Sequence, residues 1–83
     1  MKTTRYFEEQ VLRKRRYLTI EMCRAIIADP IERREQEDGR IRHWGRVILP
    51  SASETRILRV VTLDDGLTLH NAFIDRGYRE REK

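Results

Sequence analysis

Two histidines, His43 and His70, are the side chains of this sequence whose ordinary pKa suits both proton donation and proton acceptance near neutral pH. Metal-free cleavage of RNA requires a base for the 2′-hydroxyl group, an acid for the leaving oxygen, and cations that bind the phosphate. Arg34 and Arg59 carry planar guanidinium groups that can bind a phosphate in bidentate geometry. These residues predict a catalytic group of His43, His70 and Arg59, with Arg34 binding the phosphate. The alternative is that each histidine is an ordinary structural or surface residue.

Further cations and one tyrosine are candidates for binding RNA. Residues 13–16 are four successive cations at the expected end of a helix, where they either contact phosphate or complement the helix dipole. Near the C-terminus, Tyr78 could stack on a base, or it could pack against the edge of a sheet. The predicted RNA-binding residues, besides Arg34, are therefore Arg13, Arg16, Arg76 and Tyr78.

Other chemically suggestive residues have a simpler interpretation. Trp44, with Arg42 and Arg46 two positions away, is either a cationic stacking platform or a core residue, and we favour the core for the one tryptophan of a small protein. Asp64 and Asp65 precede a glycine, which favours a turn over a pair of catalytic carboxylates. The sequence has no zinc-ligand spacing, glycine-rich phosphate loop or nucleophile elbow, so we expect no metal and no cofactor.

Composition limits the architecture and the partners. A chain of 83 residues is enough for a single domain with a small core, here residues 1–83. Its net charge of +4 suits a polyanion such as RNA or an acidic protein partner. The single cysteine, Cys23, cannot form an intramolecular disulfide. Because the chain has neither a signal peptide pattern nor an apolar run long enough for a membrane, we expect a soluble cytoplasmic protein without membrane contacts.

The first third of the chain predicts two helices. Phe7 and Val11 share one face of a helix over residues 5–16, which Thr3 or Thr4 can cap. Thr19 is the expected N-cap of a second helix over residues 20–28, and the Asp-Pro pair at 29–30 ends it.

The rest of the chain predicts two β-hairpins. Asp-Gly pairs at 38–39 and 65–66 are typical of two-residue hairpin turns, and a Pro-Ser-rich loop at 50–54 separates the hairpins. With residues 38 and 39 as the turn, the first hairpin pairs Arg34 with His43. A charged tail at residues 75–83 follows the last strand. The expected strands span residues 31–37, 40–49, 55–63 and 67–74.

Alternation along these strands assigns side chains to two faces of the sheet. Leu58, Val60, Leu69 and Phe73 share the face that we expect to pack against the helices, and Trp44 can join them. The other face then collects the candidate chemistry, namely Arg34, His43, Arg59 and His70. The predicted fold is α+β, with two N-terminal helices packed on one face of a four-stranded antiparallel sheet.

This pattern of two helices before four antiparallel strands resembles the RelE and BrnT toxins, within the wider group of barnase-like ribonucleases. The resemblance lies in VLRKRRYLT at residues 11–19, DGR at 38–40, and LRVVT at 58–62 with the strand that follows. Many members of the group carry a histidine early in the first helix, where this chain has Tyr6 and Phe7. The resemblance implies RNA as the substrate class and an antitoxin protein as the partner.

The leading hypothesis is a toxin-like domain that binds RNA, with metal-independent endoribonuclease activity as its extension. An acidic antitoxin would be the protein partner of such a domain. Two alternatives are a non-catalytic module that binds protein through the same face or edge of the sheet, and a homodimer that pairs through an edge strand.

Overall fold

A computed structural model describes residues 2–49 and 55–78 of the chain. The predicted loop at 50–54 and the last five residues of the predicted tail lie outside the described residues. Within the described residues, no helix is long and apolar enough to cross a membrane. The elements, in chain order, are η1 (Phe7–Leu12), α1 (Ile20–Ala28), β1 (Glu32–Glu35), β2 (Ile41–Ile48), β3 (Thr55–Thr62) and β4 (Leu69–Ile74).

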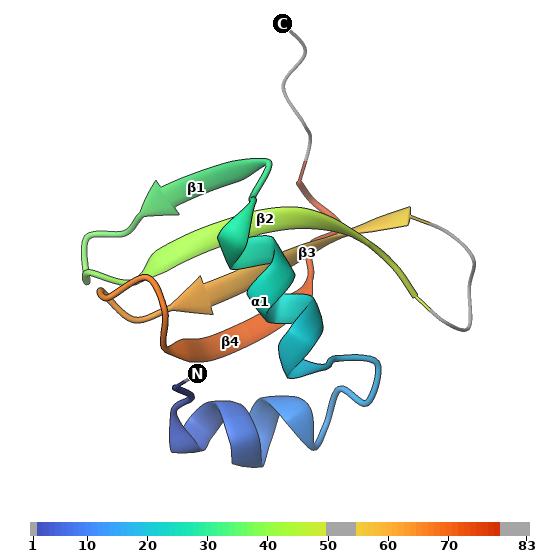
Figure 1. Cartoon of the computed structure of the whole chain (residues 1–83), viewed down its shortest axis with the longest axis horizontal. Helices are drawn as coiled ribbons and strands as arrows, with labels where there is room; N and C mark the ends of the chain where they lie inside the picture. The colour runs from blue at the N-terminus through green and yellow to red at the C-terminus, as the bar shows by residue number, and fades with distance from the viewer. Residues whose placement is uncertain (1, 50–54, 79–83) are drawn as a thin grey trace, which may run out of the picture.

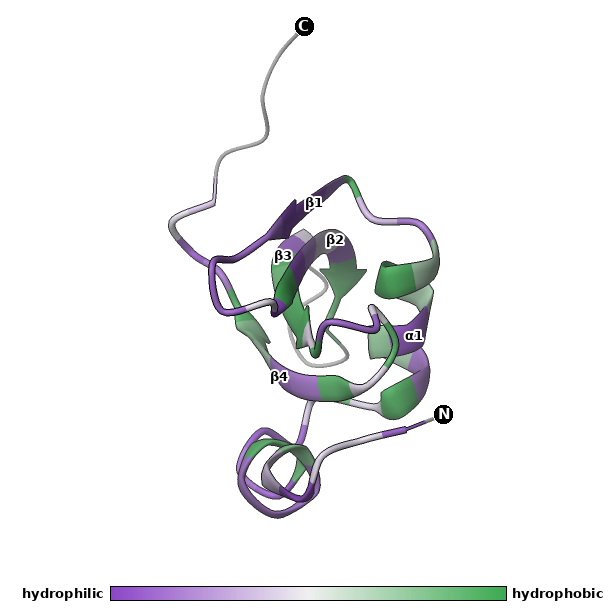
Figure 2. Cartoon of the chain, turned by 90° about the vertical axis from the view of Figure 1, so that its left-hand side faces the viewer, coloured by the Kyte–Doolittle hydropathy of each residue, from purple (hydrophilic) through white to green (hydrophobic). Residues whose placement is uncertain are grey.

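The four strands form one antiparallel sheet in the order β1-β2-β3-β4 (Figure 1). Helix α1 crosses one face of the sheet and contacts β2 and β3, whereas η1 lies beyond the edge formed by β4 (Figures 1 and 2). The predicted α+β class is therefore confirmed, as is the sheet of two hairpins. The predicted pair of helices on one face is wrong, because only α1 occupies that face.

The first helical segment differs most from its prediction. In place of an α-helix over residues 5–16, a short π-helix spans Phe7–Leu12 and is followed by turns. Thr4 acts as the predicted cap, because its hydroxyl oxygen accepts a hydrogen bond from the Phe7 N–H at 3.0 Å. Phe7 and Val11 are fully buried, as their spacing predicts. Arg13 and Arg16, three positions apart, would share a face of a continued helix and repel each other there.

Helix α1 matches its predicted bounds. Thr19 caps it by accepting a hydrogen bond from the Met22 N–H at 3.0 Å. Cys23 and Ile26 are buried against the sheet. The approach is close at Gly45 of β2, where a Cβ added to the glycine would lie 2.7 Å from Ile26 Cγ1. A side chain at position 45 would therefore displace α1.

The first hairpin turns differently from the predicted two-residue turn. The Gly39 N–H donates to the Gln36 carbonyl at 3.0 Å, and the Gln36 N–H donates to the Arg40 carbonyl at 2.8 Å. Gly39 has φ of 89°, a left-handed conformation that closes a three-residue loop. The extra loop residue moves the register by one position. Arg34 consequently pairs with Arg42 rather than with His43.

The second hairpin keeps the predicted register only near its turn. The Leu63 N–H donates to the Thr68 carbonyl, and Thr62 pairs with Leu69. The register then shifts by one residue, so that Val61 pairs with Asn71 and His70 is the extra residue of a β-bulge. The bulge therefore moves each side chain of β4 after His70 to the face opposite the predicted one. Phe73, which we predicted to face the helices, instead shares the opposite face with its partner Arg59.

The main core lies between α1, η1 and the sheet. The face that α1 covers carries buried apolar residues, among them Val47, Leu58 and Val60. Strand β1 at the far edge is hydrophilic (Figure 2). The central buried members of this core are Phe7, Val11, Cys23, Ile26, Leu58, Val60, Leu69 and Ala72.

Candidate functional site

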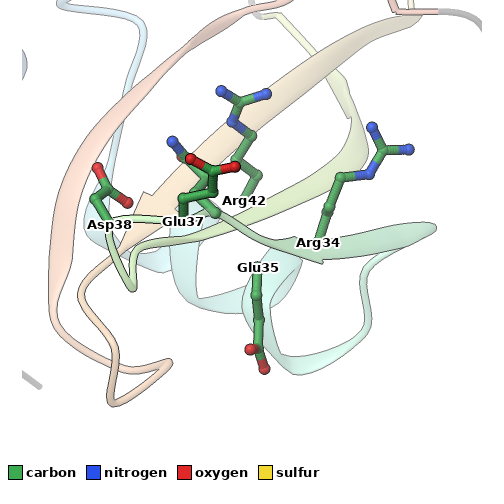
Figure 3. A pocket seen from close by; sticks show the side chains of 6 residues that line it. Arg34, Glu35, Glu37, Asp38 and Arg42 are labelled. Atoms are coloured by element: carbon green, nitrogen blue, oxygen red, sulfur yellow. The ribbon is translucent and has the colours of Figure 1, made fainter.

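The face of the sheet opposite α1 carries four arginines from three neighbouring strands. One of them is Arg46 of β2, and the other three form the candidate site. Arg34 of β1 pairs directly with Arg42 of β2, and Arg59 of β3 pairs with Trp44. We call this surface the arginine face and define it by Arg34, Arg42, Trp44, Arg59 and Phe73. Figure 3 shows Arg34 and Arg42 extending to the same side of the first hairpin, while Glu35 points to the other side.

Arg34 and Arg42 line a hollow of about 460 Å³ over the first hairpin (Figure 3). Its other lining residues are Gln36 and the three carboxylates Glu35, Glu37 and Asp38. Arg34 has one close carboxylate, Glu32, whose Oε2 lies 2.6 Å from Arg34 Nη2. Among the described residues, Arg42 has no carboxylate partner. Because directly opposed like charges destabilise a sheet, the Arg34–Arg42 pair is an unfavourable arrangement for folding alone.

Arg59 is held against two aromatic rings and one carboxylate. Its guanidinium carbon lies 4.4 Å from the centre of the Phe73 ring and 5.9 Å from that of Trp44. Its Nε lies 3.4 Å from Asp75 Oδ2. Burial lowers the pKa of Arg59, the charge of Asp75 opposes that effect, and the nearby charge of Arg42 adds to it. Arg59 and Arg42 also line the same hollow.

Asp75 joins the last strand to the arginine face. Its Oδ2 accepts a hydrogen bond from the Trp44 Nε1–H at 3.0 Å, and its Oδ1 accepts one from the Gly77 N–H at 3.1 Å. Burial by itself would raise the pKa of Asp75. The Trp44 hydrogen bond and the charge of Arg59 outweigh burial, so the pKa lies below its ordinary value.

Trp44 is buried, as we favoured, but on the arginine face and not in the core under α1. The pairing of β2 with β3 sets Trp44 opposite Arg59, and the alternation of β2 then turns it away from α1. Tyr78 stacks on it, with ring centres 5.4 Å apart and planes 25° from parallel. The Tyr78 hydroxyl donates to Glu32 Oε1 at 2.9 Å. Tyr78 therefore covers the tryptophan and ties the segment after β4 to β1.

His70 lies at the β4 end of the arginine face. Its Nδ1 is 3.0 Å from Thr4 Oγ1, and its ring lies against that of Tyr6, with centres 5.1 Å apart. Burial lowers the pKa of His70, the charge of Arg40 lowers it further, and Asp38 partly opposes them. His70 shares a hollow with Arg42 and Arg59.

His43 lies on the opposite side of the sheet from this group. Only 2% of it is exposed, and its Nδ1–H donates to the Val60 carbonyl at 3.2 Å. Burial lowers the pKa of His43, because it penalises the charged imidazolium. The predicted grouping of His43 with Arg34, Arg59 and His70 on one face is therefore wrong. Alternation along β2 separates His43 from Arg42 and Trp44.

The other predicted RNA-binding residues lie apart from the three arginines. Arg13 and Arg16 are exposed in the turns after η1. Arg76 is exposed in the turn after β4 and lines a separate hollow with Arg56. Of the predicted residues, the structure brings together Arg34, Arg59, His70 and Tyr78 around one face.

Metal and thiol chemistry find little support in the described residues. Within residues 2–49 and 55–78, no three His, Cys, Asp or Glu side chains are grouped so that they could hold a metal ion. Cys23 is fully buried, and burial raises the pKa of its thiol to about 12. The thiol therefore stays protonated at neutral pH.

Several residues of this surface were not among the predicted site residues. Arg42 appeared only as a neighbour of Trp44, Tyr6 and Asn71 had no assigned role, and Phe73 was expected to pack against the helices. Arg42 could have been found from the three-residue loop, because that loop sets it opposite Arg34. Asn71 and Phe73 depend on the bulge at His70, for which the sequence carries no local signal.

Comparison with known proteins adds no assignment to this geometry. No family model matches the chain, and neither a curated protein nor a solved structure matches it. The functional argument therefore depends on the arrangement of the residues themselves.

Proposed function

We propose that the arginine face binds RNA through its phosphates. The observation that carries this proposal is the direct pairing of Arg34 with Arg42. Two cations on adjacent strands repel each other in the free protein, and an anion between them removes that cost. Local arrangements that oppose folding are characteristic of functional sites, where binding of the ligand offsets their unfavourable free energy.

The distribution of the charges favours a polyanion over a single small anion. Arg34, Arg42 and Arg59 come from three successive strands, so they form a row across the sheet and not one compact cage. Arg42 lines two hollows, one with Arg34 and one with Arg59. Successive phosphates of one strand suit such a row, because guanidinium groups bind phosphate oxygens in bidentate geometry.

This proposal fits the toxin-like domain implied by the resemblance to RelE and BrnT. An acidic antitoxin that competes for the arginine face would complete that interpretation. The proposal does not include cleavage by a pair of histidines, because His43 and His70 lie on opposite sides of the sheet and cannot act on one phosphate.

Pairing of two chains through a sheet edge has less support. The exposed edge strand β1 has four residues, and it carries ion pairs between Arg33 and Glu35 and between Arg34 and Glu32. Short, charged edge strands resist pairing with another chain. At the other edge, the N-terminal segment pairs with Leu69 of β4.

The direct test is the affinity for a fluorescently labelled RNA at fixed salt, measured by anisotropy. We expect Arg42→Ala to weaken binding at least about 10-fold, equivalent to about 1.5 kcal/mol for one charge-assisted hydrogen bond. Arg24→Ala is the matched control, because Arg24 is an exposed cation of α1, on the other side of the sheet. Equal affinities of the two variants would refute the proposal.

A further inference from the structure

A second hollow adjoins the arginine face at its β4 end and has a volume of about 350 Å³. This is near the lower end of the range for small-molecule sites. Its chemistry is mixed, combining three arginines, two side-chain amides and aromatic rings. The lining residues that matter here are Tyr6, Gln36, Arg42, His70, Asn71 and Phe73.

The N-terminal segment positions the most exposed ring of this hollow. Backbone hydrogen bonds join Thr4 and Lys2 to Leu69 of β4, so the segment pairs alongside that strand. Thr4 also bonds to His70 at 3.0 Å, which fixes the ring against which Tyr6 rests. Tyr6 itself is 47% exposed. An aromatic ring held in place by a neighbour, yet open to solvent, offers a prepared surface for stacking.

Two amide side chains stand in the same hollow. Asn71 uses its carbonyl oxygen to accept the Ala72 N–H at 2.9 Å, so its amide N–H groups act as donors. Gln36 offers both a donor and an acceptor. Amide groups of this kind form hydrogen bonds with the edges of nucleobases, and aromatic rings stack on their faces.

We propose that this hollow binds one unpaired nucleobase of the RNA, with Tyr6 stacking on the base and Gln36 and Asn71 contacting its edge. The inference rests on the proposed RNA binding by the arginine face. Arg42 lines both hollows, so a base seated here keeps its own phosphate beside the arginine row. The ligand class is accordingly single-stranded RNA, because a base within a duplex is stacked and has its pairing edge occupied.

The test compares a short labelled single strand with a hairpin duplex of the same length, by anisotropy at one salt concentration. We expect the full chain to prefer the single strand. Loss of one stacked base costs about 5- to 150-fold in affinity. Tyr6→Ala should therefore weaken single-strand binding by an amount in that range and leave duplex binding unchanged. Tyr6→Phe keeps the ring and should bind the single strand more tightly than Tyr6→Ala.

An RNA that is abasic throughout its binding length removes the bases without changing the protein, so this measurement does not depend on the folding of a variant. We expect the parent protein to bind this RNA about 5- to 150-fold more weakly than the intact strand. Equal binding of single strand and duplex, with no effect of Tyr6→Ala, would overturn the base site while leaving the arginine face intact. Absence of salt-sensitive RNA binding, or binding of an acidic protein alone, would instead overturn the proposed function.

Discussion

The contact between Gly45 and Ile26 allows a quantitative test of how α1 packs on the sheet. A Cβ at position 45 would lie 2.7 Å from Ile26 Cγ1 and 3.1 Å from Cγ2, whereas ordinary contacts begin at 3.4 Å. Both atoms belong to a buried side chain, so they cannot turn away into solvent. We expect Gly45→Ala to destabilise the fold by about 1–3 kcal/mol through overpacking. In a domain of this size, each kcal/mol lowers Tm by about 4–8 °C.

A double-mutant cycle isolates this clash from other effects. Ile26→Ala alone should cost about 2–5 kcal/mol, because it leaves a cavity in the core. It also removes the two nearest atoms, so the double variant should be destabilised by at least about 1 kcal/mol less than the sum of the single changes. Urea unfolding followed by circular dichroism measures all three values.

Gly77→Ala is the matched control for this cycle. The nearest atom to its added Cβ, Asp75 Oδ1, lies at 3.7 Å, an ordinary contact, and Gly77 is exposed. We expect a change within about 0.5 kcal/mol. Additive effects of Gly45→Ala and Ile26→Ala, or a neutral Gly45→Ala, would show that α1 does not approach the sheet at this point.

Two further predictions concern the aromatic stack and the dependence of stability on pH. Tyr78→Ala should uncover Trp44, which shifts the tryptophan fluorescence to longer wavelength and increases its quenching by acrylamide. Tyr78→Phe keeps the stack and should change neither the wavelength nor the quenching. Unchanged quenching in both variants would contradict the stack. The folded state lowers the pKa of His43 and His70 below the ordinary 6.5, so the unfolded chain binds protons first on acidification. The free energy of unfolding should therefore fall as the pH decreases below about 6.5. Urea midpoints between pH 7.5 and 5.5 should show a smaller fall in His43→Gln than in the parent, and an equal fall would refute the buried neutral histidine.

Local signals in the sequence predicted the elements well. Thr19 and the Asp-Pro pair set both ends of α1, and the alternation of β-branched residues located β2, β3 and β4 to within a few residues. These signals are local, since caps and turns act within a few positions of the chain. The predicted first helix was too long, because the apolar spacing of Phe7 and Val11 does not indicate where a helix ends.

The candidate site was harder to predict, because register sets which side chains share a face. One extra residue in the first loop replaced His43 by Arg42 as the partner of Arg34. One bulge at His70 then moved Phe73 to the arginine face. Asp-Gly is compatible with loops of two or three residues, and tertiary packing determines the bulge. A histidine pair predicted from spacing alone was therefore vulnerable to a shift of one residue.

The salt dependence of RNA binding tests the arginine face most directly. For single strands, each phosphate contact contributes about 0.7 to the slope of log affinity against log salt concentration. We expect the double variant Arg34→Ala, Arg42→Ala to lower the magnitude of that slope by about 1.4, while Arg24→Ala leaves it unchanged. A slope that is the same in the parent and in the double variant would contradict phosphate binding at this face.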